Sequence, residues 1–145
     1  MTDAALEPDG EGFVGWRSPR EDFNAVFGLI RARVEGERVR CRVETGPARA
    51  NGMDMIHGGF MLAFLDQVLF VAPQALGRVR IGEAVTLAQS SQFLDAGRID
   101  QPLDAVVEIL RETGRLLFLR GVMEQEGRLL LSFEGTLRKF SAPRG

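Results

Sequence analysis

The chain has 145 residues, 45% of them hydrophobic and 26% charged, which fits one domain with a complete buried core. Its 18 basic and 20 acidic side chains nearly balance, so the composition gives no reason to expect binding to nucleic acid. The single cysteine excludes an internal disulfide, and the first residues lack the basic-then-apolar pattern of a secretion signal, so we expect a cytoplasmic protein. Residues 1–17 are predicted to form a flexible tail and residues 18–145 a single domain.

The first regular element is predicted to be a short helix. Ser18 is placed to cap it, and Pro19 fits the first helical position, where a missing N–H does no harm. Glu21 then completes a capping box. We expect this helix to end near Phe27.

Two strands follow, at residues 29–35 and 38–44. The second alternates strictly, with Val39, Cys41 and Val43 separated by arginines. This pattern predicts a hairpin with one buried face and one wet face.

A loop over residues 45–57 leads to a long helix that begins at Gly58 and ends near Pro73. Within residues 60–72 all but two side chains are apolar, on every side of the helix, so we expect the rest of the chain to enclose it. The apolar run is shorter than the ~20 residues of a membrane span and carries Asp66, so we reject a membrane-spanning helix.

The remaining sequence predicts four more strands separated by glycine-containing turns, at residues 84–94, 103–112, 115–124 and 128–140. Strands joined by such tight turns are antiparallel. The fold expected is α+β, with a six-stranded antiparallel sheet wrapped around the long central helix.

Asp66 is the strongest indication of function. Burying an unpaired carboxylate in such apolar surroundings costs several kcal/mol, which favours a functional acid. The alternative is a structural acid that arginine or backbone donors satisfy.

A second group of candidates surrounds the start of the long helix. Gly58 and Gly59 lack Cβ atoms, so a ligand can approach the unpaired N–H groups of the first turn. One such donor to a developing oxyanion contributes roughly 2.7–4 kcal/mol to transition-state stabilisation. His57 and Asn51 flank this turn. The alternative is that the two glycines only make a tight turn.

Gly58 and Asp66 cannot reach one carbonyl group within a single chain, because they lie ~12 Å apart along the helix. Two copies related by a two-fold axis, with antiparallel helices, bring Gly58 of one chain to Asp66 of the other. We therefore predict a homodimer with shared sites.

Other chemistries lack their residues. One histidine excludes a multi-histidine metal site, and the chain has neither a Gly-x-Ser-x-Gly elbow nor a phosphate-binding loop with lysine. No metal or cofactor is expected.

The motif Asn51-x5-His57-Gly58-Gly59-x6-Asp66 resembles that of the hotdog-fold acyl-CoA thioesterases, in the branch of the phenylacetate-pathway (PaaI-like) enzymes. The strand with Gln92-Phe93-Leu94, the Gly114-Arg115 turn and the final strand ending in Gly135-Thr136 are also similar. The resemblance implies dimers with a continuous sheet, often paired into tetramers, and an acyl-CoA substrate with no separate cofactor.

The resemblance also implies residue roles. Asp66 is the expected catalytic carboxylate, as a general base or a nucleophile, and the Gly58 N–H polarises the thioester oxygen. His57 orients the substrate or shapes the loop, and Asn51 positions water or the carbonyl. Gly59 and Thr86 are expected to contact the substrate. Where some relatives carry a polar residue one turn after the acid, this chain has Phe70.

Two alternatives stay open. One is a hydratase or dehydratase on the same fold, and the other is a module that binds acyl-CoA without turnover. Candidates for the CoA phosphates are Arg78, Arg80, Arg115 and Arg120, and candidates for an acyl or aryl pocket are Phe60, Phe64 and Phe70, although each set also fits ordinary surface or core positions.

Overall fold

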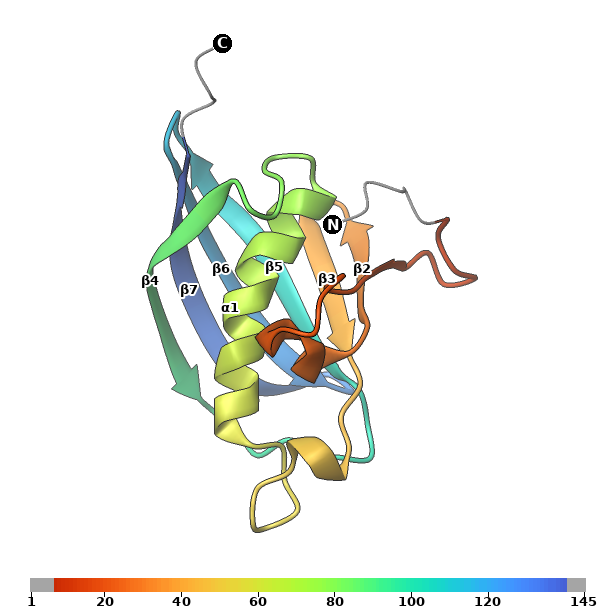
Figure 1. Ribbon diagram of the computed structural model, residues 1–145. Helices are drawn as coiled ribbons and strands as arrows, with labels where there is room; N and C mark the ends of the chain where they lie inside the picture. Colours follow the sequence, from red (N-terminus) through yellow and green to blue (C-terminus); the bar gives the residue numbers. More distant parts are fainter. Residues whose placement is uncertain (1–6, 141–145) are drawn as a thin grey trace.

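The computed structural model describes residues 7–140, in which one long helix packs across the concave face of a seven-stranded antiparallel sheet (Figure 1). The strand order is β1-β2-β3-β5-β6-β7-β4. The elements are β1 (Val14–Trp16), the 3-10 helix η1 (Phe23–Phe27), β2 (Ile30–Glu35), β3 (Arg38–Val43), the 3-10 helix η2 (Pro47–Arg49), α1 (Gly58–Ala75), β4 (Ala84–Phe93), β5 (Leu103–Glu112), β6 (Leu116–Gln125) and β7 (Arg128–Lys139). The predicted fold class is confirmed, with seven strands instead of six.

The amino-terminal part of the prediction needs two corrections. β1 lies within the segment predicted as a flexible tail and pairs with β2, and Phe13 beside it is buried. The predicted helix at Ser18 is instead the 3-10 helix η1, which Asp22 caps by accepting a hydrogen bond from the Asn24 N–H at 3.0 Å. Ser18 donates its hydroxyl hydrogen to Asp22 and so supports the cap from outside the helix.

The inner face of the sheet packs closely on α1. Val39, Cys41 and Val43 are fully buried, as their alternation predicted, and burial raises the pKa of the Cys41 thiol. A Cβ atom at Gly135 of β7 would lie 2.5 Å from Leu69 Cδ1 of α1, so only glycine allows the helix this close to the strand.

The rest of the chain encloses α1 on most sides, as predicted, but leaves one face open. The short helix η1 lies beside α1 on the β2 side (Figure 1). Its Phe27 packs on Phe60 and Phe64 of α1, with ring centroids 5.9 and 6.2 Å apart. On the β4 side, Leu62 and Phe70 keep solvent exposure. α1 is long and apolar enough by length and composition to cross a membrane, but more than half of it is buried within the chain, as in a core helix.

The sheet has two unequal edges. One edge is the three-residue β1, and the other is the ten-residue β4, whose only neighbour in the described sheet is β7. Val85 and Leu87 on β4 are 38% and 55% exposed. A long edge strand with exposed apolar side chains is typical of an interface.

Candidate active site

The start of α1 leaves one backbone donor without a partner. His57 is the N-cap, and its Nδ1 accepts a hydrogen bond from the Gly59 N–H at 2.8 Å. Nδ1 must be unprotonated to accept this bond, and the Gly59 amide is thereby used within the chain. Within the described residues the Gly58 N–H has no acceptor, which leaves it for a ligand.

Asn51 shapes the loop that delivers His57. Its side-chain oxygen accepts hydrogen bonds from the N–H groups of Met53 and Met55, at 2.8 and 3.1 Å. The His57 N–H donates to the carbonyl oxygen of Arg49 at 2.8 Å, so both ends of the loop are tied together. Asn51 and His57 therefore lie in one compact loop before Gly58, and the side chain of each accepts hydrogen bonds from the backbone of this region.

Gln125, which the sequence analysis did not single out, anchors this loop from behind. It is buried, and its amide bonds the N–H and the carbonyl oxygen of Arg98, each at 2.8 Å. Beside it, the Gly97 carbonyl accepts from the Ile56 N–H at 2.9 Å. The position of Gly58 thus depends on a glutamine at the end of β6, and an isolated glutamine gives no sequence motif.

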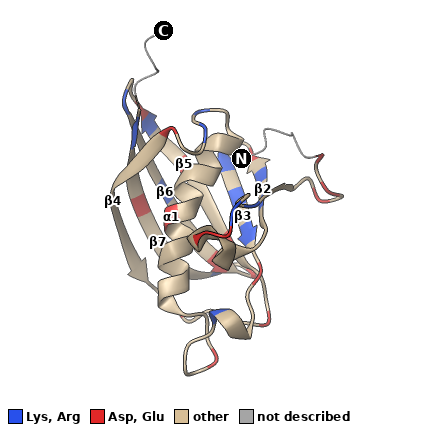
Figure 2. Ribbon diagram, in the orientation of Figure 1, with Lys and Arg blue, Asp and Glu red and all other residues tan. Residues whose placement is uncertain are grey.

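Asp66 is half-buried rather than buried, and it is the one charged residue of α1 (Figure 2). The Thr86 hydroxyl of β4 donates a hydrogen bond to Asp66 Oδ1 at 3.0 Å. Within residues 7–140 no arginine or lysine forms an ion pair with this carboxylate. Thr86, predicted as a substrate contact, therefore orients the acid of its own chain.

The candidates form two separate groups on the open side of the helix. Gly58, Leu62, Asp66 and Phe70 follow one another at intervals of four residues, so they share one face of α1. Asn51, His57 and Gly58 lie at its start, and Asp66 lies with Thr86 two turns further on.

One aromatic residue, Phe93, packs against Gly58 of the first group. A Cβ atom built on Gly58 would lie 3.3 Å from Cζ of Phe93, at the end of β4. The Phe93 side chain is 54% exposed. A side chain at position 58 would require this exposed ring to move by a few tenths of an ångström.

Phe60 and Phe64, predicted as either pocket or core, are core residues: their rings stack 6.5 Å apart and both side chains are buried. Phe70 alone of the three lies on the open face. The core interpretation therefore holds for two of the three aromatic side chains.

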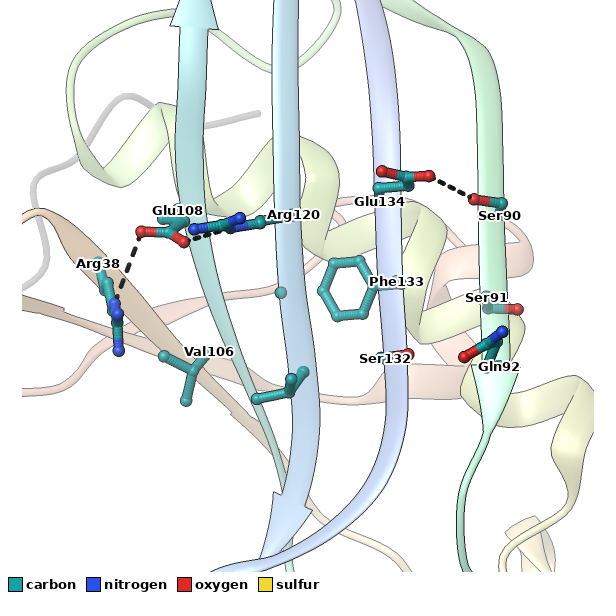
Figure 3. A pocket seen from close by; sticks show the side chains of 12 residues that line it. Arg38, Ser90, Ser91, Gln92, Val106, Glu108, Arg120, Ser132, Phe133 and Glu134 are labelled. Carbon is teal, nitrogen blue, oxygen red and sulfur yellow. Dashed lines mark hydrogen bonds and ion pairs between the residues drawn. The ribbon is translucent and has the colours of Figure 1, made fainter.

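A hollow of about 640 Å³ lies on the outer face of the sheet, away from α1 (Figure 3). Three of its four charged side chains pair with one another: Glu108 lies 2.6 Å from Arg120 and 3.7 Å from Arg38. The hydrogen bond from Arg120 lowers the pKa of Glu108. Arg120, a candidate for the CoA phosphates, therefore lies on the face of the sheet opposite α1 and pairs with Glu108.

Of the other arginine candidates, Arg78 pairs with Glu112 at 3.4 Å, whereas Arg80 and Arg115 have no ion pair within the described part of the chain. Among the same residues, no three His, Cys, Asp or Glu side chains gather as metal ligands would.

Comparison with known proteins identifies the family. The sequence profile of the thioesterase superfamily matches residues 53–132, and a search of curated proteins gave no match. Among solved structures, thioesterase superfamily member 2 from zebra fish superimposes with a TM-score of 0.71 at 16% identity, over 83% of this chain and 88% of that chain. A hypothetical thioesterase from Streptococcus pneumoniae TIGR4, solved with coenzyme A, gives a TM-score of 0.67 at 22% identity, over 79% and 94%.

The profile match covers more than half of the chain and includes His57, Gly58, Asp66 and Thr86. The structures add the fold, since both share the sheet wrapped around a long helix. The chain therefore belongs to the thioesterase superfamily, as a hotdog-fold hydrolase that acts on thioester bonds.

Proposed function

We propose that this protein is a PaaI-like acyl-CoA thioesterase that hydrolyses a small or medium acyl- or aryl-CoA to the free acid and CoA. The observation that carries the proposal is the open face of α1. Among residues 7–140, the Gly58 N–H has no acceptor there and the Asp66 carboxylate has no cation beside it. These are the donor and the acid that thioester hydrolysis needs. The coenzyme A in the Streptococcus pneumoniae structure supports CoA as the carrier.

The site becomes complete in a dimer. Gly58 and Asp66 are ~12 Å apart along α1, so one thioester cannot contact both in one chain. If two helices pack antiparallel so that Gly58 faces Asp66 of the other subunit, the two-fold axis passes Leu62, halfway between them. Leu62 is 37% exposed, and the free β4 edges can then pair into one continuous sheet.

In the proposed reaction the Gly58 N–H of one subunit stabilises the developing negative charge on the thioester oxygen. Asp66 of the other subunit either takes a proton from the attacking water or attacks the carbonyl carbon itself. In both routes a C–O bond forms to the acyl carbon, the C–S bond breaks, and the CoA thiolate leaves and takes up a proton. When Asp66 is the nucleophile, the product of this step is an acyl–Asp66 anhydride, and water then cleaves it to release the free acid and restore the carboxylate. Water is the only co-reactant, so no cofactor is required.

The two routes differ in the fate of the water oxygen. Single-turnover hydrolysis in ¹⁸O-labelled water puts the label into the product acid if Asp66 is the base. If Asp66 is the nucleophile and water attacks the aspartyl carbonyl of the anhydride, the label enters the Asp66 carboxylate, so labelled Asp66 identifies the nucleophilic route. Mass spectrometry of product and protein separates them.

The activity is tested by following free thiol release from acetyl-, hexanoyl-, benzoyl- and phenylacetyl-CoA. We expect hydrolysis of at least one substrate by the native protein and its loss in Asp66→Asn. Glu37→Gln, a change at an exposed acid in the β2–β3 turn, is the matched control and is expected to keep activity. Absence of thiol release across the panel would contradict the proposal. Formation of an enoyl product would favour the hydratase instead, and tight binding without turnover the binding module.

The dimer is tested separately with Leu62→Arg. A charge at the proposed two-fold axis is expected to give monomers and to abolish activity, while the exposed position keeps the effect on chain folding small. Light scattering on the native protein also decides between dimer and the tetramer implied by the family resemblance. A native protein that is monomeric at working concentration would remove the shared site.

A further inference from the structure

The Phe93 ring packs against Gly58, whose N–H is the proposed oxyanion donor. Neither the hydrophobic core nor the proposed reaction assigns this side chain a role. Its ring lies 3.3 to 3.4 Å from the Cβ position of Gly58, although 54% of the side chain is exposed. Core packing does not explain an aromatic ring held at this place and left half open. A group bound at the Gly58 N–H would lie against it.

The pairing of β4 also points Phe93 toward the proposed site. Phe93 is paired with Leu131 and Thr86 with Leu137, both fully buried on the α1 side, so Phe93 and Thr86 face the helix layer too. If two β4 edges pair antiparallel over their full length, Phe93 lies opposite Ala84 of the other subunit. Thr86 of that subunit, which holds its Asp66, is then only about 7 Å further along the strand.

The surroundings of Phe93 favour the acyl group over the CoA moiety. Leu62, one helical turn after Gly58 on the same face of α1, is 37% exposed. The apolar side chains of Phe93 and Leu62 offer no hydrogen-bond partner for the amides of pantetheine or for its phosphates. They suit the hydrocarbon part of a substrate.

We propose that Phe93 is a specificity-determining residue that forms an apolar wall for the acyl group at the Gly58 end of the shared site. The inference rests on the proposed thioesterase function and deepens it. The substrate class is then an acyl group with apolar or aromatic bulk close to the thioester carbonyl, such as a phenylacetyl or hexanoyl group rather than an acetyl group.

The test compares native protein with Phe93→Ala and Phe93→Leu on acetyl-, hexanoyl- and phenylacetyl-CoA. Phe93→Ala is expected to lower kcat/KM about 10-fold or more for the two larger groups and less than about 2-fold for acetyl-CoA. Phe93→Leu is expected to retain hexanoyl-CoA hydrolysis and to lose more on phenylacetyl-CoA. Leu110→Ala, at a similarly exposed apolar residue of β5, is the matched control and leaves all three unchanged.

Calorimetry with the corresponding non-hydrolysable thioether analogues, and with CoA alone, keeps the inference separate from the thioesterase proposal. We expect Phe93→Ala to weaken the larger analogues about 10-fold or more and to leave CoA alone unchanged. Native protein that binds analogues in this Phe93-dependent way but hydrolyses nothing would overturn the thioesterase proposal and support Phe93. An equal loss for every acyl group, a loss on CoA alone, no change, or no binding of any analogue would overturn the role of Phe93.

Discussion

Two aspartates of this chain, the half-buried Asp66 on α1 and the buried Asp104 on β5, have opposite electrostatic surroundings. Asp104 is 8% exposed and accepts hydrogen bonds from Arg40 at 2.9 Å and from Arg42 at 2.7 Å. That contact raises the pKa of Arg42. Among the described residues, Asp66 has a single hydrogen bond, from the neutral hydroxyl of Thr86. An acid that arginines satisfy is a structural acid, and an acid left without a cation remains able to react.

Strand pairing, and not local sequence composition, distinguishes the two acids. The sequence singles out Asp66 because its neighbours are apolar, whereas no sequence pattern singles out Asp104. In the structure Asp104 is the more deeply buried of the two. Its partners come from β3, more than 60 residues earlier, so its burial depends on strand pairing and not on local composition.

The largest expected effect is on catalysis at Asp66. Asp66→Asn keeps the shape and the hydrogen bond from Thr86 but removes the charge, so kcat is expected to fall by roughly 10²–10⁴-fold. The free energy of unfolding should change by no more than about 0.5 kcal/mol, since no ion pair is lost. Thiol release and urea unfolding of the same preparation measure both. A strongly destabilised Asp66→Asn would mean that Asp66 is a structural acid.

The same substitution at the other aspartate is expected to give the reverse result. Asp104→Asn leaves Arg42 without its carboxylate partner, and should lower the free energy of unfolding by about 2–4 kcal/mol. Activity per folded molecule should stay close to native, because Asp104 lies on the outer face. Urea denaturation measures the free energy of unfolding, and activity assays at urea concentrations below the unfolding transition measure the activity of the folded variant. If Asp104→Asn instead inactivated a stable protein, the distinction between the two acids would fail.

A smaller effect is expected at Thr86. Thr86→Val keeps the shape of the side chain and removes the hydroxyl that orients Asp66, so kcat should fall about 10-fold while KM changes little. Thr86→Ser is expected to restore most of the rate. Equal kinetics for valine and serine would show that the hydrogen bond does not matter.

The smallest effect concerns Glu35, which shares Arg40 with Asp104. Burial alone would raise the pKa of Glu35, but Arg33 and Arg40 outweigh it and lower that pKa below its ordinary value of 4.5. The resulting stability is present above about pH 4.5 and is lost as the pH falls through the lower folded value. Because the side chain is a third exposed, Glu35→Gln should reduce the acid-induced loss by less than about 1 kcal/mol. Urea unfolding of native protein and variant at a series of acidic pH values measures this loss of unfolding free energy. A larger loss in Glu35→Gln than in the native protein would contradict the predicted direction.

Most of the fold could be predicted from local patterns. Alternating side chains and glycine turns placed six strands within about two residues of their ends, and Gly58 marked the start of α1. β1 was not predicted, because three residues are too few to show the alternation of a strand. The cap at Asp22 was missed because Ser18, Pro19 and Glu21 form an equally good local signal.

The open face of α1 could not be predicted, because Leu62 and Phe70 look the same in sequence whether they face the core or another subunit. For a related reason, Gln125 was not predicted at all, and Phe93 was named only within the strand that resembles the family. Each acts through residues far away in the chain, Gln125 through Arg98 and Phe93 through Gly58. Sequence spacing identified the candidate residues, and the structure separated them into two groups.

The central claim is that Asp66 acts with Gly58 of another subunit, and subunit mixing tests it most directly. Gly58→Pro removes the donor N–H at the first helical position, where proline is tolerated, and the extended His57 backbone suits a following proline. Asp66→Asn and Gly58→Pro are each expected to be inactive alone. A purified heterodimer of the two, carrying different affinity tags, contains one intact site and should recover about half of native activity. A heterodimer as inactive as both parents would contradict the shared site.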